Sequence, residues 1–160
     1  MSQEIERAFE LAPGQELPAL PGLGEFREFI LEATYYDTRH FALTRARHVL
    51  RRRAGGEDEG WHVKLPGTDI EHRVEHHPPL GTPRPPAELR ALIEGPLAGE
   101  ALLPVARLHT VRRQAELRGP SGELWALVCV DDVTATSPVA EQTWREAEIE
   151  LAGGAPELIE

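Results

Sequence analysis

The chain has 160 residues, 41% of them hydrophobic and 28% charged, and its formal net charge is −10 at pH 7. This length suits one domain, and the negative charge argues against a nucleic-acid partner, because phosphate backbones require surface cations. No stretch approaches the roughly 18 apolar residues of a membrane helix, and the polar start MSQEIERAFE does not resemble a signal peptide. The single cysteine, Cys129, excludes an internal disulfide and a cysteine-rich zinc site, so we expect a cytoplasmic protein with no membrane partner.

Alternation of apolar and polar residues predicts eight strands, because successive side chains of a strand point to opposite faces. The predicted strands are Glu4–Leu11, Phe26–Thr38, His48–Ala54, Gly60–Leu65, Ile70–His77, Leu102–Arg118, Glu123–Val133 and Thr143–Leu151. The segments AGGEDEG, PGTD and RGPSG between them have the composition of tight turns. The expected fold is therefore mainly β: a closed eight-stranded antiparallel barrel with a few flanking helices.

Two helices and a final turn complete the prediction. Asp37 and Thr38 are suited to cap a short helix ending near Arg45. The segment Pro86–Glu94 follows the stiff connection HPPLGTPRPP and places three apolar side chains on one helical face, those of Leu89, Leu92 and Ile93. The closing APELIE begins another helix, so we expect the chain to be a fragment of something longer.

On six of the strands, the face opposite the apolar residues carries ionisable groups. They are Glu4, Glu6 and Glu10; Arg51 and Arg53; His62 and Lys64; Glu71, Arg73, Glu75 and His77; Arg112 and Glu116; and Glu146, Glu148 and Glu150. One interpretation is a solvated face, whose ion pairs contribute little. The other is a barrel with these faces inward, which would be a binding site because buried charge is costly unless paired or metal-bound.

The inward interpretation suits a phosphate ligand. An arginine guanidinium grips phosphate oxygens with two hydrogen bonds and does not deprotonate. Carboxylates in the same interior would repel a polyanion unless a hard divalent cation joined them to it, and Mg²⁺ and Mn²⁺ prefer such oxygen ligands. The tryptophans Trp61, Trp125 and Trp144 lie in predicted strands, where we expect them to pack in the core.

An ordered set of motifs along the whole chain resembles the CYTH domain, also called the triphosphate tunnel metalloenzyme superfamily. The motifs are EIERAF at residues 4–9, YDT at 36–38, LRRR at 50–53, HVK at 62–64, RVE at 73–75, TVR at 110–112, VDDV at 130–133 and WREAEIEL at 144–151. The resemblance implies a single CYTH domain over residues 1–160, with its C-terminal helix truncated. It also implies a tunnel that binds triphosphate compounds together with Mg²⁺ or Mn²⁺.

The resemblance assigns roles by position. The metal-holding positions match Glu4, Glu6, Asp131, Glu148 and Glu150. The phosphate-holding positions match Arg51, Arg53, Lys64, Arg73 and Arg112. Glu75 matches an acidic position that orients metal or water, and the catalytic candidates are Glu4, Glu6, Glu75 and Lys64. Two registers stay open, because Arg113 is an alternative to Arg112 and Asp132 is an alternative to Asp131. Strand alternation favours Arg112, since Arg113 shares its face with the apolar Ala115 and Leu117.

The chain departs from the family pattern at three places. Ala8 replaces the signature lysine, His77 stands where an acidic residue is frequent, and the closing helix is missing beyond Glu160. Ala8 removes a cation next to the substrate, which weakens the case for catalysis more than the case for binding.

The expected function is metal-dependent binding and hydrolysis of inorganic triphosphate or short polyphosphate. The alternatives are a polyphosphate-binding module without catalysis, preceding a C-terminal CHAD domain in the full-length chain, or a thiamine triphosphatase or class IV adenylyl cyclase.

Overall fold

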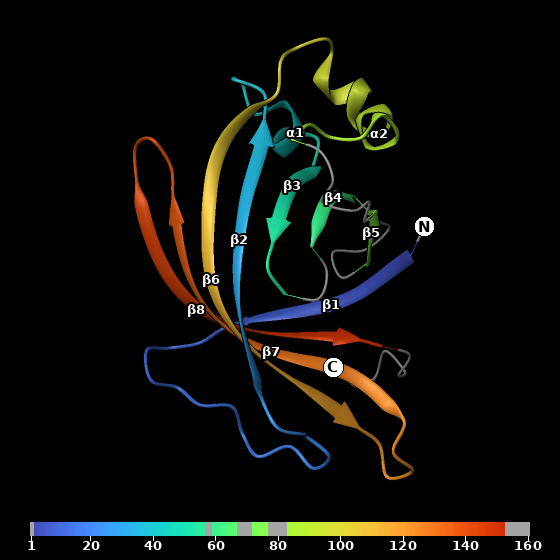
Figure 1. Cartoon of the computed structure of the whole chain (residues 1–160), viewed down its shortest axis with the longest axis vertical. Coiled ribbons are helices and arrows are strands. Elements are labelled where there is room, and N and C mark those ends of the chain that lie inside the picture. Colours follow the sequence, from blue (N-terminus) through green and yellow to red (C-terminus); the bar gives the residue numbers. More distant parts are fainter. Residues whose placement is uncertain (1, 57–58, 67–71, 77–82, 153–160) are drawn as a thin grey trace.

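The computed structural model describes residues 2–56, 59–66, 72–76 and 83–152, with the backbone alone for 2–5 and 72–76. Its strands are β1 (Ser2–Glu10), β2 (Arg27–Asp37), β3 (Val49–Ala54), β4 (Gly60–Leu65), β5 (His72–His76), β6 (Leu103–Arg118), β7 (Leu124–Thr136) and β8 (Glu141–Leu151). Its helices are α1 (Ala42–Arg45) and α2 (Ala87–Leu97). Figure 1 shows the strongly curled strands, with both helices together beside β3 and β4.

Every ladder between these strands is antiparallel. The hydrogen-bonded order is β1-β5-β4-β3-β2-β6-β7-β8, and β1 pairs with β8 as well as with β5. The longest ladders join β2 to β6, β6 to β7 and β7 to β8. The predicted mainly β, antiparallel fold with flanking helices is confirmed.

The strand predictions differ from the structure mainly at their ends. β7 continues to Thr136, three residues beyond the predicted end at Val133, because the hairpin turn comes later: the Ser137 N–H donates to the carbonyl of Ala140. Most of the predicted turn PGTD lies outside the described residues. The helix predicted at APELIE lies entirely outside them. The connection HPPLGTPRPP lies partly outside them.

The end predicted for the second helix was wrong. α2 continues through Pro96 to Leu97, rather than ending at Glu94. A proline inside a helix removes one backbone hydrogen bond, and burial of the Leu97 side chain offsets that loss. Ala98 then ends the helix in the left-handed conformation.

The first helix depends on Asp37 and Thr38, as predicted, although it begins only at Ala42. The Asp37 carboxylate accepts hydrogen bonds from the backbone N–H groups of Leu43 and Thr44, and the Thr38 hydroxyl accepts one from Ala42. Burial tends to raise the pKa of Asp37, but hydrogen bonds from the Thr44 hydroxyl and from the backbone N–H groups of Leu43, Thr44 and Thr38 outweigh it and lower that pKa. Hydrogen bonds therefore connect the end of β2 to the start of α1.

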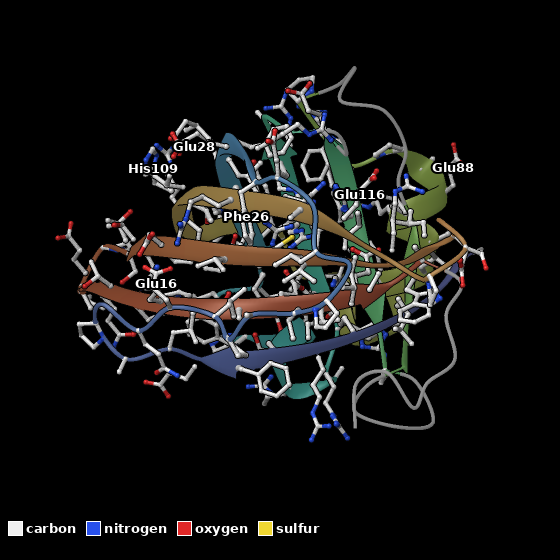
Figure 2. All side chains as sticks on the ribbon, turned by 90° about the horizontal axis from the view of Figure 1, so that it is seen from below. Glu16, Phe26, Glu28, Glu88, His109 and Glu116 are labelled. Atoms are coloured by element: carbon white, nitrogen blue, oxygen red, sulfur yellow. The ribbon has the colours of Figure 1, made fainter. Side chains whose placement is uncertain are left out.

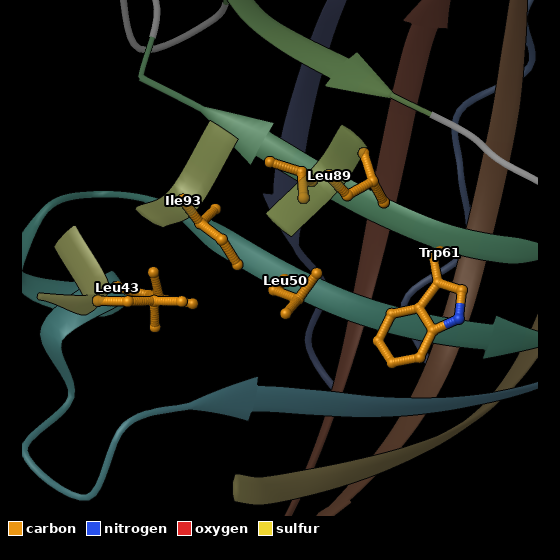
Figure 3. Close-up of a cluster of buried hydrophobic side chains, with 7 residues drawn as sticks. Leu43, Leu50, Trp61, Leu89 and Ile93 are labelled. Carbon is orange, nitrogen blue, oxygen red and sulfur yellow. The ribbon is translucent and has the colours of Figure 1, made fainter. Parts of the chain in front are cut away.

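The main apolar core lies between the helices and one face of β3 and β4. It contains Leu43, Leu50, Trp61, Val63, Leu89, Ile93 and Leu97, and Figure 3 shows it at close range. Because side chains alternate along a strand, the residues between these apolar ones face the other way. We call that other face of the sheet the inner face.

A second, smaller core covers the outer face of β7 and β8. The loop after β1 crosses these strands, so that Leu11 and Leu17 pack against Val130 and Ala147. Near the end of this loop, the Gly22 carbonyl accepts a hydrogen bond from the N–H of Arg118. Apolar contacts thus lie outside the curled sheet. Among the described residues, no helix is long and apolar enough to cross a membrane.

Candidate functional site

Both faces of β4 are buried, although only one of them is apolar. Trp61 and Val63 fill the outer core, and the intervening His62 and Lys64 are 0% and 8% exposed. Arg53 on the neighbouring strand is 6% exposed. The inward-facing charge predicted from the alternation is therefore present on these strands, so the solvated-face interpretation does not hold for them.

Six of these side chains, contributed by six strands, form what we call the charged cluster: Glu6, Arg53, Lys64, Arg112, Asp131 and Glu148. The strand register explains why β6, β7 and β8 contribute to one place. Arg112 lies directly opposite Asp131, and Asp131 lies opposite Glu146, two residues before Glu148. Opposed residues in an antiparallel ladder share a face, as do residues two apart on a strand, so these four positions belong to the inner face.

Arg112 joins two acidic groups of the charged cluster. Its Nε lies 2.9 Å from Asp131 Oδ1, and its Nη2 lies 2.7 Å from Asp131 Oδ2 and 2.6 Å from Glu148 Oε2. Burial lowers the pKa of Arg112, but the two carboxylates outweigh it and raise that pKa. Arg112 therefore stays charged, and its fork geometry fixes the orientation of both acids.

Lys64 and Glu6 form the second ion pair of the charged cluster, with Nζ 3.1 Å from each carboxylate oxygen. Glu6 is also close enough to Glu148 to affect its ionisation. Burial and the neighbouring Glu6 raise the pKa of Glu148, even though Arg112 and Lys64 oppose the shift. Two carboxyl groups this close cannot both ionise at low cost unless a cation lies between them.

The same excess of negative charge affects the neighbouring acids. Burial raises the pKa of Asp131 despite the hydrogen bond from Arg112 and the charge of Arg53. Burial, with the charges of Glu148 and Asp131, also raises the pKa of Glu146. The protein's own cations thus compensate these acids incompletely.

Oxygen donors under mutual repulsion are suited to a hard divalent cation, so the donor chemistry fits Mg²⁺ or Mn²⁺. In the described side chains, no three histidine, cysteine, aspartate or glutamate groups converge on one point as metal ligands do. The physical reason is visible: Arg112 and Lys64 take the carboxylate oxygens that a metal would use.

Arg51 and Arg53 stand next to each other on the inner face of β3. Arg51 lies opposite His62 in the β3–β4 ladder, and its Nη1 is 3.5 Å from the hydroxyl of Tyr35. Arg53 is close enough to Asp131 for its charge to oppose the rise in the pKa of that carboxyl group. The pair brings positive charge to the side of the interior opposite β8.

Three predicted site residues, Glu4, Arg73 and Glu75, have no described side chains, and the backbone register gives their positions. Glu4 pairs with Arg73 in the β1–β5 ladder, and Glu75 pairs with Lys64 in the β4–β5 ladder. Glu150 pairs with Glu6 across β1 and β8. All of these positions lie in ladders adjoining the charged cluster.

The two open registers separate clearly in space. Arg113 lies on the outer face, 3.9 Å from Glu16 and over the ring of Phe26. Asp132 is also outside, 3.4 Å from Arg145. Glu28 and His109 share that outer face and point away from the sheet (Figure 2). Arg112 and Asp131 are therefore the members of each pair that face the interior.

Glu146 and Cys129 also lie on the inner face, although neither was assigned a role in the predicted site. Glu146 lies opposite Asp131; the alternation already placed it on the ionisable face with Glu148 and Glu150, but the resemblance assigned it no role. Cys129 lies opposite Glu148, and an apolar stretch of sequence concealed it. Burial raises the pKa of the Cys129 thiol to about 12, so the thiol is neutral and inert.

Comparison with known families and sequences gives consistent results. The family model described as "CYTH domain" matches residues 2–160. The uncharacterized protein Rv2226 of Mycobacterium tuberculosis is 36% identical over 168 residues, covering 92% of this chain and 33% of that protein. Human thiamine-triphosphatase is 47% identical over 66 residues, covering 40% of this chain and 27% of that enzyme. The chain thus spans about a third of the length of the mycobacterial relative.

Solved structures of low sequence identity share the fold. The PH1819 protein of Pyrococcus horikoshii has a TM-score of 0.55 and 15% identity, with 98% of this chain and 81% of that chain covered. A proposed adenylyl cyclase of Hippeastrum, described as having a dominant triphosphatase activity, has a TM-score of 0.50 and 15% identity, with 99% and 82% covered.

Proposed function

Since the chain belongs to the CYTH domain family, we propose that it binds inorganic triphosphate or short polyphosphate on the inner face of its sheet and hydrolyses it with a divalent metal ion. The observation that carries the proposal is the charged cluster itself. Cations and carboxylates are buried together on the face that the apolar core does not use. The relatives include proteins described as a triphosphatase and as an adenylyl cyclase.

The basic residues would hold the phosphates. Arg51, Arg53 and Arg112 present guanidinium groups suited to bidentate contact with phosphate oxygens, and Lys64 adds a point charge. Arg73 joins this set through its position beside β1. Binding a polyanion would draw Arg112 and Lys64 toward phosphate and release the carboxylates that they now neutralise.

Those carboxylates would hold the metal. Glu6, Glu148 and Asp131, with Glu4 and Glu150 by register, supply the hard oxygen donors. A bound Mg²⁺ or Mn²⁺ would supply Lewis-acid stabilisation of charge on the phosphate oxygens. The chain's own contribution is to position the phosphates and to surround them with fixed cations, which is the main source of catalysis in phosphoryl transfer. Glu75, opposite Lys64, is the candidate for orienting the attacking water.

Phosphate release from inorganic triphosphate, polyphosphate, ATP and thiamine triphosphate, with Mg²⁺ or Mn²⁺, tests the proposal. We expect turnover of inorganic triphosphate that Asp131→Asn strongly reduces. Asp132→Asn is the matched control on the outer face and should leave the rate unchanged. Equal effects of the two substitutions, or no release from triphosphate or polyphosphate, would contradict hydrolysis at this site.

One observation favours a second candidate, a binding module without catalysis. Ala8 lies opposite Glu148 on the inner face, where the signature lysine of the family would add a cation. Both candidates predict that metal and triphosphate stabilise the domain, and ligand at a hundredfold its dissociation constant adds about 2.7 kcal/mol. Glu148→Gln combined with Glu150→Gln should abolish the metal-dependent rise in melting temperature. A rise in melting temperature without phosphate release would identify the binding module.

A further inference from the structure

We propose that His62 is a further phosphate-binding residue of the interior, and that its imidazole takes up a proton when the anion binds. This inference rests on the proposed function, because the ligand is the triphosphate that the basic residues would hold. It adds a titratable group to a set that otherwise consists of arginines and one lysine.

The His62 side chain is fully buried on the inner face of β4. Its two neighbours in the sequence, Trp61 and Val63, belong to the apolar core on the other face, so the alternation of the strand directs the imidazole toward the interior. A buried imidazole is costly unless its polar atoms have partners, and this one adds nothing to the apolar core. A function in the interior therefore explains its presence better than packing does.

Three of the phosphate-binding cations surround this position. Arg51 lies directly opposite His62 in the β3–β4 ladder, and Lys64 follows two residues later on the same face of β4. Arg53 lies opposite Gly60, which makes it the diagonal neighbour of His62. Opposed residues have Cβ atoms about 5 Å apart, and the diagonal or next-but-one neighbours are about 7 Å apart. A phosphate group held by these cations is therefore within reach of the His62 ring.

Charged groups from four strands adjoin the imidazole. They are Arg51 and Arg53 on β3, Lys64 on β4, the position of Glu75 opposite Lys64 on β5, and Glu6 on β1, whose carboxylate is 3.1 Å from Lys64 Nζ. Cations thus outnumber carboxylates in this set. Like charges close together disfavour one another, whereas a bound polyanion favours the protonated form of a neighbouring imidazole.

The protonated ring is the form that suits phosphate. Both of its nitrogens then carry a hydrogen to donate, and hydrogen bonds between a charged donor and a phosphate oxygen are short and strong. Histidine is also the side chain that ordinarily changes charge between about pH 5 and 8. The basic side of the interior would therefore gain one positive charge on binding, with the proton supplied by solvent.

Calorimetric titration of inorganic triphosphate, with Ca²⁺ as the divalent ion, tests the inference in two buffers of different ionisation enthalpy. The buffer dependence of the binding enthalpy gives the number of protons taken up. The ligand and acids such as Glu148 also exchange protons, so the decisive quantity is the difference between wild type and His62→Gln. We expect the wild type to take up more protons, by a fraction approaching one per ligand between about pH 6 and 8.

The affinity should show the same linkage. We expect His62→Gln to bind triphosphate about 10-fold more weakly than wild type at pH 6, on the scale of one hydrogen bond from a charged donor. The loss should be smaller at pH 8, where protonation of the ring costs more. His62→Lys supplies a charge that does not ordinarily titrate in this range, so it should retain binding at pH 8 without the additional proton uptake.

His109→Gln is the matched control, because His109 lies on the outer face of β6 with its side chain 47% exposed. It should change neither the affinity nor the proton uptake. If His62→Gln does not fold, the ¹⁵N signals of the His62 ring in the wild type, recorded with and without triphosphate, show directly whether the ring becomes protonated.

Equal proton uptake by wild type and His62→Gln would overturn the inference. So would an affinity loss of the same size at pH 6 and pH 8, which indicates a structural role alone, or His62 ring signals that stay those of a neutral imidazole in the complex. Failure of the proposed function gives a different result: the wild type then binds no triphosphate at either pH, and the inference about His62 falls with it.

Discussion

Replacing Arg112 by methionine should be among the most destabilising changes in the interior. The side chain is 13% exposed and forms ion pairs with Asp131 and Glu148, which are 4% and 23% exposed. Removing one partner of a buried ion pair costs about 3–5 kcal/mol, because the remaining charge stays buried without compensation. Against a typical domain stability of about 5–15 kcal/mol, this is a large fraction.

Urea unfolding at pH 7 measures this loss, provided that the denaturant slope stays constant. Arg113→Met is the matched control: that arginine is 34% exposed and 3.9 Å from Glu16, so its loss should cost at most about 1 kcal/mol. Adding Asp131→Asn and Glu148→Gln to Arg112→Met should restore most of the stability, because the uncompensated charges are then gone. Equal losses at the two arginines, or no recovery in the triple variant, would refute the buried ion-pair network.

Two further predictions concern pH and the loop over β6–β8. The folded-state pKa of Glu148 is raised from its ordinary value of 4.5, so the group contributes stability below pH 4.5 that is lost as pH rises through the raised value. Thermal unfolding in EDTA should therefore show Glu148→Gln more stable than wild type at neutral pH, with the difference vanishing in acid; a constant difference would refute the raised pKa. Gly22→Ala should cost more than the about 1–3 kcal/mol of a strained backbone, because its φ is +85° and a Cβ would lie 2.1 Å from the carbonyl oxygen of Arg118. The control Gly14→Ala has φ +75° with nothing within 4 Å, so it should lose only the strain energy in urea unfolding; equal losses would refute the contact with Arg118.

Much of the fold is predictable because a strand repeats every two residues. β4 has the predicted bounds Gly60–Leu65, since one of its faces is apolar and the other ionisable. The same alternation favoured Arg112 over Arg113 as the inward-facing arginine. The end of α2 was missed because Pro96 is a local signal for termination, whereas burial of Leu97 is a tertiary effect that no local pattern contains.

The alternation of apolar and polar residues does not predict which charged groups pair with each other. Alternation shows that Arg112 and Glu148 each face inward, but only the register between strands brings Arg112 within 2.6 Å of Glu148. The course of the loop after β1 was equally beyond the local pattern, because its contacts are tertiary: the Leu11 N–H donates to the carbonyl of Arg145, and Leu11 and Leu17 pack against Val130 and Ala147.

Calorimetric titration of inorganic triphosphate in the presence of Mg²⁺ tests most directly whether the inner face is the binding site. Arg53 and Arg52 are neighbours on β3 that point to opposite faces, since Arg52 pairs with Trp61 of the outer core and Arg53 pairs with Gly60. Arg53→Ala should weaken binding by about 1.5–3 kcal/mol, the scale of a hydrogen bond to a charged group. Arg52→Ala should leave the affinity unchanged. Equal effects of the two substitutions, or no binding of triphosphate to the wild type, would contradict a triphosphate site on the inner face.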